Sequence, residues 1–380
     1  MRVEKLSSLS DSKKLLYALG VDEGGIKILS SKMKMHIISI KELHVGAANI
    51  LKQDALSIGA DLAVPRGTVV AKTQYVDVLL IATQKQLETL SRKELAQPFG
   101  LKELATKLKE ISIAKKPAQT QIMGIINAND DSFYAQSRFS AKEAISRIEA
   151  MIEEGADIID IGAVSSRPDA AHVSADEELS RLQDILDVIA HERLYERVKL
   201  SIDSYEPKPI AYALERGFSI INDITGLTND EVCKLCASYD ATAVIMHMQG
   251  TPQTMQHAPE YQSILSDISS FFHERIEKAQ SFGVKDIILD VGIGFGKTLE
   301  DNLSLIKNLE HFLKFDKALL VGASRKSMIN AISVSDVSQR LAGSLTLHLE
   351  SAKNGASILR VHDVKEHAQA LRVQEALRSV

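Results

Sequence analysis

Cysteine is scarce in this chain, which has two among 380 residues, Cys233 and Cys236. Their Cys-x-x-Cys spacing is that of a redox pair or of half a zinc site, but the sequence holds no second pair to complete such a zinc site. The flanking residues 231–237 have the pattern of a helix whose i and i+3 positions face a core, where free cysteine behaves as a small apolar residue. We therefore favour a structural role for both cysteines over redox or metal chemistry.

Excess positive charge and long apolar runs are also missing. The chain has 45 Lys and Arg against 50 Asp and Glu, a formal net charge of -5, and no basic tail, which argues against nucleic acid or an anionic membrane as a partner. No run approaches the roughly 18 apolar residues of a bilayer span, and residues 1–10 lack the apolar centre of a signal peptide. We expect a cytoplasmic protein that acts on small molecules.

Both common phosphate-binding glycine motifs are absent, although one stretch comes close to them. An apolar run ends at Asp290 and is followed by three alternating glycines and then Lys297. A P-loop would need glycine where Val291 stands, and the dinucleotide pattern G-x-G-x-x-G meets Lys297 or Leu299 at its third glycine. We interpret the stretch as a strand that delivers Asp290 to a pocket, followed by a tight turn. Lys297 is then predicted to be a surface or turn residue, not a phosphate ligand.

The chain is long enough for one large domain and a smaller one, and 45% hydrophobic residues supply ample core material. Residues 1–116 predict a small α/β module, with strands at 35–40 and 76–82 and helices at 47–58, 84–95 and 101–111. The polar, proline-bearing segment 114–120 is predicted to be the linker. No chemistry can be assigned to this module, for which oligomer contact, capping and regulation all stay open.

From residue 121 a short apolar run, a turn and an amphipathic helix recur. The predicted strands are 122–126, 158–162, 198–202, 219–221, 243–246, 286–289, 318–322 and 357–361, with helices such as 141–154, 176–190, 207–215, 264–282 and 337–353 between them. Continuously apolar strands alternating with helices are typical of a parallel sheet covered on both faces. Eight such units predict that residues 117–380 form a TIM (β/α)8 barrel, with an open doubly wound sheet as the alternative.

Polar residues follow every predicted strand. They are Asn127, Ser165-Ser166-Arg167, Asp203, Asn222-Asp223, His247, Asp290, Ser324 to Ser327, and Arg360 with His362 and Asp363. Any one strand-end carboxylate is as often a helix cap as a ligand contact. In a barrel, however, all of these residues share one rim, and charged groups that converge there need a polar ligand to compensate them.

Charge sorts these residues into two groups. Lys326, Arg167, Arg360 and His362 suit a phosphate-type oxyanion, and Asn127 can bind a hard cation such as Mg²⁺. Asp203, Asn222 and Asp290 suit a heterocycle that presents several N–H donors, because a carboxylate only accepts hydrogen bonds. No Ser-His-Asp or Cys-His pattern stands out, so covalent catalysis is not required.

Nine blocks, in this order, resemble the motifs of dihydropteroate synthases. They are Met123-Gly-Ile-Ile-Asn-Ala, Gly155-Ala-Asp-Ile-Ile-Asp-Ile-Gly, Ser165-Ser-Arg-Pro168, Ser201-Ile-Asp-Ser-Tyr205, Ile221-Asn-Asp223, Met246 to Gln256, Asp290 to Thr298, Ser324-Arg-Lys-Ser327 and Arg360-Val-His-Asp-Val364. The resemblance covers residues 121–380. It implies a transferase of folate biosynthesis, a target of sulfonamides, that condenses 6-hydroxymethyl-7,8-dihydropterin diphosphate with 4-aminobenzoate and releases pyrophosphate.

The resemblance also implies roles for individual residues. Asp203, Asn222, Asp290, Lys326, Met246, Gly294 and Arg360 would hold the pterin, and Lys326, Asp203, Asp290 and Arg360 would be catalytic. Asn127, Arg167, Arg360 and His362 would bind the diphosphate, with Mg²⁺ on Asn127 as cofactor. Ser166, Pro168, Phe295 and Ser327 would flank 4-aminobenzoate. A homodimer is expected from the family alone, and residues 49–65 resemble an N-terminal extension found on some bacterial members.

The chain departs from the family pattern mainly in two loops. Asn129, Asp130 and Ala135 replace the usual residues of the first loop, and Val164, Ser166 and Asp169 those of the second; Val291 and Asp301 are further differences. Two other functions therefore stay open. One is a methyltransferase acting on methyltetrahydrofolate and a corrinoid protein, which would need no diphosphate site. The other is a non-catalytic pterin-binding protein.

Overall fold

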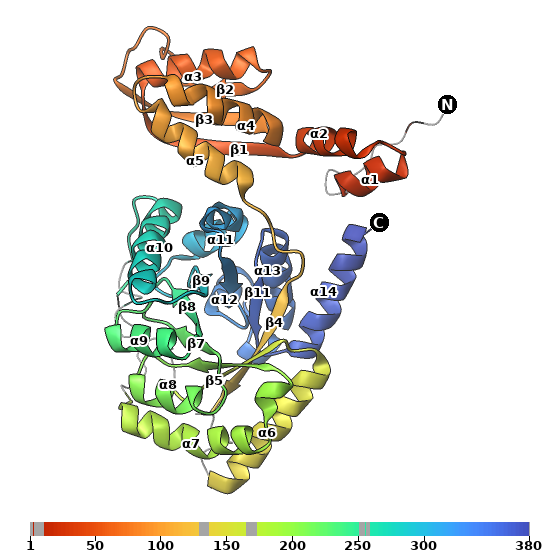
Figure 1. Cartoon of the computed structure of the whole chain (residues 1–380), viewed down its shortest axis with the longest axis vertical. Helices are drawn as coiled ribbons and strands as arrows, with labels where there is room; N and C mark the ends of the chain where they lie inside the picture. The colour runs from red at the N-terminus through yellow and green to blue at the C-terminus, as the bar shows by residue number, and fades with distance from the viewer. Residues whose placement is uncertain are drawn as a thin grey trace. The chain divides into compact units, whose positions relative to one another are not determined.

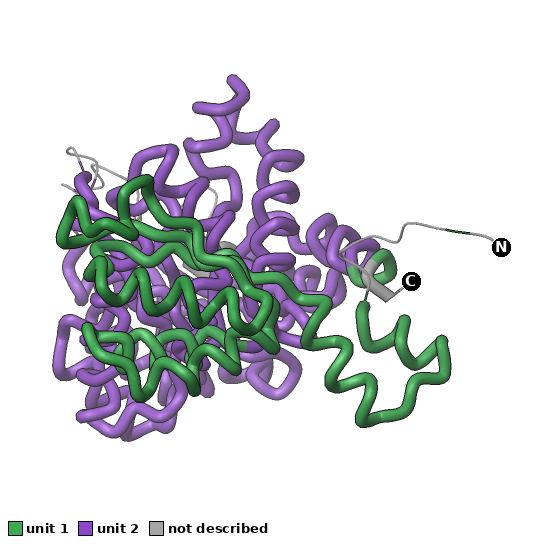
Figure 2. The backbone as a smooth tube through the Cα atoms, turned by 90° about the horizontal axis from the view of Figure 1, so that it is seen from above, with its two compact units in different colours: residues 1–114, 375–380 green, residues 115–374 purple. Residues whose placement is uncertain are grey.

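The computed structural model describes residues 3, 11–128, 137–164, 173–250, 255 and 259–379. The chain divides into two compact units, one of residues 1–114 with 375–380 and one of residues 115–374 (Figure 2). Within the described residues, no helix is both long enough and apolar enough to cross a membrane.

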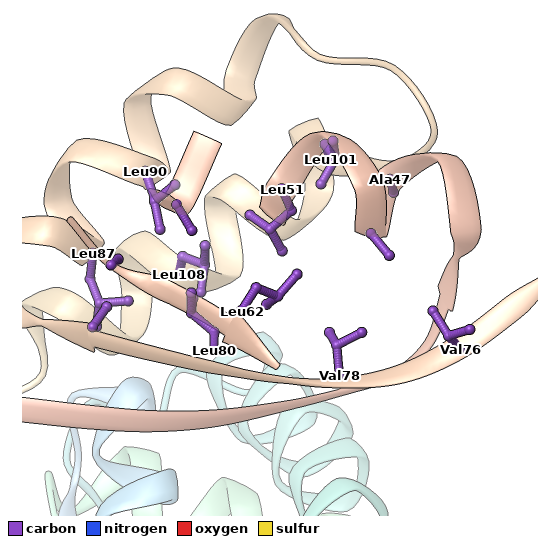
Figure 3. Close-up of a cluster of buried hydrophobic side chains, with 14 residues drawn as sticks. Ala47, Leu51, Leu62, Val76, Val78, Leu80, Leu87, Leu90, Leu101 and Leu108 are labelled. Carbon is purple, nitrogen blue, oxygen red and sulfur yellow. The ribbon is translucent and has the colours of Figure 1, made fainter. Parts of the chain in front are cut away.

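Unit 1 is a small antiparallel sheet with helices packed on it. Its elements are α1 (Ser12–Ala18), α2 (Glu23–Met33), β1 (Met35–His44), α3 (Val45–Ser57), β2 (Asp61–Ala63), β3 (Tyr75–Thr83), α4 (Gln84–Lys93), η1 (Glu94–Ala96) and α5 (Leu101–Ile113), with strand order β1-β3-β2. Side chains of α3, α4 and α5, such as Leu51, Leu90 and Leu108, meet Leu62 and Leu80 of the sheet in one buried core (Figure 3). The predicted strands and helices of this part are confirmed, whereas α1, α2 and β2 were not anticipated.

Unit 2 is a closed barrel of eight parallel strands, which confirms the TIM barrel (Figure 1). The strands are β4 (Gln121–Asn127), β5 (Ile158–Gly162), β6 (Lys199–Asp203), β7 (Ile220–Asp223), β8 (Thr242–Met246), β9 (Ile287–Asp290), β10 (Ala318–Val321) and β11 (Ile358–Val361). Each pairs with its neighbour in sequence, and β11 pairs with β4 to close the ring. All eight predicted strands are present, with ends that differ by at most one or two residues.

Helices surround the barrel (Figure 1). They are α6 (Ser137–Glu154), α7 (Ala175–His191), η2 (Leu194–Glu196), α8 (Pro207–Leu214), α9 (Asp230–Ser238), α10 (Ile264–Ser281), α11 (Leu299–Lys307), η3 (Leu309–Phe315), α12 (Ser327–Ile332), η4 (Val337–Gln339), α13 (Leu341–Lys353) and α14 (Val364–Ser379). Helix α9 buries Cys233 and Cys236 completely, and Cys236 Sγ donates to the carbonyl of Ala241, as expected for structural cysteines. The predicted helix 337–353 is two pieces, η4 and α13, joined at Arg340.

The interior of the barrel changes character along its axis. One layer is apolar and consists of Met123, Ile158, Ile220, Val244, Ile288, Leu320 and Ile358. Side chains two positions apart in a strand lie on the same face. Two positions further along five of these strands stand Asp160, Asn222, Met246, Asp290 and Arg360. The fold therefore places a polar layer directly above the apolar core, at the carboxyl ends of the strands.

Candidate active site

Arg360 is the centre of the polar layer. Its Nε donates to Asp160 Oδ2 at 2.6 Å and its Nη2 to Asp203 Oδ2 at 2.6 Å. Asn222 Nδ2 donates to the same Asp160 oxygen at 3.0 Å. Burial raises the pKa of Asp203 to about 7, while the Arg360 guanidinium opposes that rise. Both carboxylates in turn raise the pKa of Arg360, which stays charged. Three strands are thus joined through one guanidinium.

Asp160 is a site residue that the sequence reasoning did not assign, although it lies within one of the quoted motifs. It is fully buried, and its second oxygen, Oδ1, has no hydrogen-bond partner. The sequence does contain a signal for Asp160, which is a carboxylate inside an apolar strand. Such a group is expected to be buried, and a buried charge must be paired. Its partner Arg360 is 200 positions away in sequence.

Lys326 and Asp290 form the opposite part of this layer. Burial lowers the pKa of Lys326 to about 8, and nearby Asp290 and Asp203 act to raise it. Burial also raises the pKa of Asp290, whose Oδ1 accepts the N–H of Gly292 at 2.7 Å. Lys326 Nζ lies 4.1 Å from the centre of the Phe295 ring. A cation, a carboxylate and an aromatic face are therefore presented together.

Gly294 allows this close approach. Its φ of +81° lies in the left-handed region, and a Cβ there would be 3.3 Å from Lys326 Cδ. Met246 and Phe295 belong to one buried apolar cluster with Ile224 and Met255. Apolar side chains therefore lie close to the carboxylate of Asp290, a combination that suits a flat heterocycle.

The prediction for Lys297 is confirmed in that it lies in the turn between β9 and α11, but it is wrong about the surface, because the side chain is buried, with an exposed fraction of 4%. Its Nζ contacts His247 Nδ1 at 3.0 Å, the carbonyl of His247 at 3.2 Å and the carbonyl of Phe295 at 2.8 Å. Burial lowers the pKa of Lys297 to about 7 and that of His247 to about 3. A neutral His247 accepts from the ammonium group, so both residues stabilise the turn between β9 and α11.

Two other carboxylates, one at the end of a strand and one at the start of a helix, are structural. Asp223 accepts from the N–H groups of Thr225 at 2.6 Å and Leu227 at 3.1 Å, and so fixes the turn after β7. Asp301 caps α11 together with Thr298. Asp223 is therefore structural, but it stabilises a turn and is not a helix cap, since the N-cap of α9 is Asn229.

The predicted diphosphate side is partly described. His362 is half-buried, its Nδ1 lies 2.9 Å from Ser324 Oγ, and burial with the charges of Arg360 and Arg325 lowers its pKa to about 4. Asn127 ends β4, beside Gly162 of β5. Ser327 is the exposed first residue of α12. Ser166, Arg167 and Pro168, and the altered first loop with Asn129, Asp130 and Ala135, lie outside the described residues.

Comparison with known proteins covers the barrel and, for some relatives, nearly the whole chain. The model of the family described as "Pterin binding enzyme" matches residues 123–362. A bifunctional dihydropteroate synthase/dihydropteroate reductase of Helicobacter pylori is 44% identical over 365 residues, which are 96% of each chain. A dihydropteroate synthase of Escherichia coli is 41% identical over 261 residues, which are 68% of this chain and 92% of that one.

A solved structure gives the same result. The crystal structure of the Yersinia pestis dihydropteroate synthase with a sulfonamide drug complex has a TM-score of 0.64 and 37% identity, and it covers 69% of this chain and 96% of that chain.

Proposed function

The chain belongs to the dihydropteroate synthase family of pterin binding enzymes, and we propose that its polar layer binds and activates a pterin diphosphate for transfer to 4-aminobenzoate. It is a transferase of folate biosynthesis. The observation that carries the assignment of residues is the convergence of Asp203, Asp290, Lys326 and Arg360 above the apolar core of the barrel. These groups comprise acceptors for a nitrogen-rich ring and cations for a phosphate in one pocket.

The acceptors hold the ring. Asp203 and Asp290 are the last residues of β6 and β9, and Asn222 is the last but one of β7. Their oxygens suit the several N–H donors of a dihydropterin. Arg360 lies between two of the strand acids and presents its guanidinium plane to the ring, while Met246 and Gly294 line the slot. Because β6, β7 and β9 fix these side chains, the ring is oriented before the reaction begins.

Arg360, Arg167 and His362 are proposed to bind the leaving group. Arg360 lies on β11, His362 directly follows the strand, and Arg167 lies outside the described residues. The two arginines supply charge, whereas His362, whose pKa is lowered to about 4, is a neutral hydrogen-bonding group. A hydrogen-bond donor or charge at each diphosphate oxygen stabilises the negative charge that grows as the carbon–oxygen bond breaks. The electron-rich ring, next to buried carboxylates, tolerates the positive character left on its methylene carbon.

The described part of the chain offers Mg²⁺ few ligands. In the described part of the chain, no group of three or more His, Cys, Asp or Glu side chains could hold a metal ion. Asn127, at the end of β4, supplies one amide oxygen, which fits an ion that takes most of its ligands from phosphate and water. When bound, Mg²⁺ would neutralise charge on the diphosphate.

The second substrate needs only to be positioned. Phe295 and Ser327, with Ser166 and Pro168 outside the described residues, are proposed to flank 4-aminobenzoate. Its amine forms a carbon–nitrogen bond to the methylene carbon, pyrophosphate leaves with the electrons of the carbon–oxygen bond, and the amine loses a proton. No covalent enzyme intermediate is required.

The experiment is a direct assay. Purified protein with the pterin diphosphate, 4-aminobenzoate and Mg²⁺ should release pyrophosphate and form dihydropteroate in equal amounts. Binding without turnover would favour a non-catalytic pterin-binding protein. Undiminished binding of the diphosphate by Arg360→Ala would contradict the diphosphate site and favour the methyltransferase alternative.

A second activity is favoured by one observation. The bifunctional relative covers 96% of this chain, whereas the Escherichia coli synthase covers 68%. We propose that this chain also reduces dihydropteroate, by adding a hydride and a proton across one carbon–nitrogen double bond of the ring. Supplying dihydropteroate with reduced nicotinamide or reduced flavin as the hydride donor tests this proposal, and no donor-dependent tetrahydropteroate would refute it. Deleting residues 1–114 would show whether unit 1 is needed.

We also propose a homodimer. Five exposed apolar side chains lie on or next to α11 and α12, which contact each other: Leu299, Leu303, Ile332, Val334 and Val337. Such a group suits an interface between two copies. Light scattering on the full chain should give twice the monomer mass, and Leu303→Glu with Ile332→Glu should halve it.

A further inference from the structure

Two buried histidines have no role in the proposed chemistry, yet they connect its two sides. His348 of α13 and His367 of α14 have exposed fractions of 0% and 1%. The N–H of Ala323 donates to His348 Nε2 at 2.9 Å, His348 Nδ1 lies 2.8 Å from His367 Nε2, and His367 Nδ1 lies 2.6 Å from the carbonyl of Asp363. We call these three contacts, from Ala323 to Asp363, the histidine relay.

The relay joins the loop that carries Lys326 to the loop that carries His362. Ala323 lies in the loop after β10, three residues before Lys326, and Asp363 directly follows His362 after β11. The same loops also meet through Ser324 Oγ and His362 Nδ1 at 2.9 Å. Arg325 Nε donates to Asp363 Oδ2 at 3.1 Å. The relay is thus one of several contacts between the same two loops, and its two side chains are buried.

Helix α13 holds the first loop at two points. Ser344 lies one turn before His348 on the same face of the helix. Its Oγ accepts the N–H of Arg325 at 2.8 Å, while His348 accepts that of Ala323. Arg325 has a φ of 56°, in the left-handed region that arginine seldom adopts. Two side chains of one helix therefore hold a strained loop whose next residue is Lys326.

The ends of the relay determine where its protons lie. A backbone N–H can only donate, so His348 Nε2 carries no proton, and a carbonyl can only accept, so His367 Nδ1 carries one. The middle contact then has a single solution, in which His348 Nδ1–H donates to His367 Nε2. Both rings are neutral Nδ1–H tautomers. One added proton would place two N–H groups against each other at one of the contacts.

We propose that His348 and His367 are positioning residues, a neutral histidine pair that locks the loop of Lys326 to the loop of His362 in the geometry that binds the pterin diphosphate. This inference rests on the proposed function of those loops. The ring acceptors of β6, β7 and β9 are not part of the relay. Loss of the relay should therefore weaken binding of the diphosphate more than binding of the bare ring.

Protonation of either histidine ring at low pH is expected to disrupt the relay. Burial lowers the pKa of both histidines. The groups that face the pair are His362, Asp363 with its partner Arg325, and Glu366; the two acids raise the pKa of His367, and His362 lowers that of His348. Since the unfolded chain gains these protons first, the free energy of unfolding should decline as pH falls below about 6.5. The diphosphate affinity of the folded protein should decline only at lower pH, where the buried rings themselves gain a proton.

Three variants of the full-length protein test the pair. His348→Phe and His367→Leu each break the relay and should lower kcat/KM for the pterin diphosphate by about tenfold or more. The affinity for 6-hydroxymethylpterin, which lacks the diphosphate, should change by less than about threefold. Because the two rings act as a unit, the double variant should be no worse than the poorer single variant.

His367→Gln provides the rescue. Its amide oxygen can accept from His348 Nδ1–H, and the Asp363 carbonyl still receives the backbone N–H of residue 367. This variant should keep nearly full diphosphate affinity. His311→Phe is the control, since His311 of η3 is half-buried and bonds Ser269 of α10 and Lys314 of η3; it should leave both ligand affinities unchanged.

Two results would overturn the inference. One is an equal loss of affinity for both ligands that follows the loss of thermal stability, which is what a merely structural pair would produce. The other is a ¹⁵N NMR spectrum in which either ring is charged or an Nε2–H tautomer at neutral pH. Both measurements remain informative if the unaltered protein forms no dihydropteroate, a result that would count against the proposed function instead.

Discussion

The turn between β9 and α11 carries a buried lysine, Lys297, and the loop between β10 and α12 carries a half-buried one, Lys326. The fold uses them differently. Burial lowers the pKa of both, to about 7 for Lys297 and about 8 for Lys326. Lys297 meets three acceptors, all from its own turn and His247. Lys326 faces the Phe295 ring and the carboxylates of Asp290 and Asp203. A buried cation with its donors satisfied by the fold is structural, whereas one that faces shared carboxylates is available to a ligand.

Substituting Lys326 should have the largest effect on activity. Lys326→Ala is expected to lower kcat/KM by about 10³-fold, because a fixed cation beside the ring and the leaving group is lost. The free energy of unfolding should change by less than about 1 kcal/mol, since Arg360 still balances the acids. Steady-state kinetics and urea unfolding measure both quantities. Lys285→Ala, at an exposed lysine, is the control. If Lys326→Ala is as active as Lys285→Ala, Lys326 does not bind the ligand.

Asp203 tests the carboxylates that Lys326 and Arg360 share. Asp203→Asn keeps the size of the side chain but removes one charge and one acceptor, and should lower kcat/KM by about 10²-fold. Affinity for the bare pterin ring, measured by calorimetry, should fall as well. If the ring affinity stays unchanged while kcat/KM falls, Asp203 orients Arg360 and does not bind the ring. The exposed Asp176 offers the control Asp176→Asn.

Lys297 should show the opposite pattern. Lys297→Met leaves three acceptors without a donor and should lower the free energy of unfolding by about 2 kcal/mol. Its kcat/KM should stay within about tenfold of the unaltered protein, since the side chain makes no proposed contact with substrate. If Lys297→Met lowers kcat/KM as much as Lys326→Ala does and leaves the free energy of unfolding unchanged, Lys297 binds a substrate after all.

The difference between these lysines shows what the sequence can predict. The eight strands were predictable because each is a short apolar run followed by a helix of period 3.6, which are local signals. The strand-end residues Asp203, Asn222, Asp290 and Arg360 follow from that pattern, since parallel strands align their carboxyl ends at one rim. The order of the barrel thus brings residues from distant parts of the sequence into one layer.

Burial of Lys297 was not predictable in the same way. Gly-Lys-Thr after a strand has the composition of an exposed turn, and what buries Lys297 comes from His247, 50 positions earlier. Asp160 was missed for a related reason, because its partner Arg360 is 200 positions away. The histidine relay depends on two helices and two loops. Local patterns give elements and their ends, but the pairing of buried polar groups depends on tertiary contacts.

The smallest expected effect concerns pH and would separate the two lysines by thermodynamics alone. Lysine in an unfolded chain has a pKa of about 10.4, and burial lowers that of Lys297 to about 7. Between these values the unfolded chain binds more protons, so the free energy of unfolding rises with pH. Lys297→Met removes this contribution, while Lys326 contributes equally to both proteins.

The difference in unfolding free energy between the unaltered protein and Lys297→Met should therefore grow by about 1 kcal/mol as pH rises from 7 to 8. Urea unfolding at three pH values measures this change. The control is the exposed Lys285: the difference in unfolding free energy between the unaltered protein and Lys285→Met should not vary with pH. A constant difference would mean that Lys297 stays fully protonated throughout, so that its acceptors offset its burial completely and the two lysines differ in geometry but not in proton affinity.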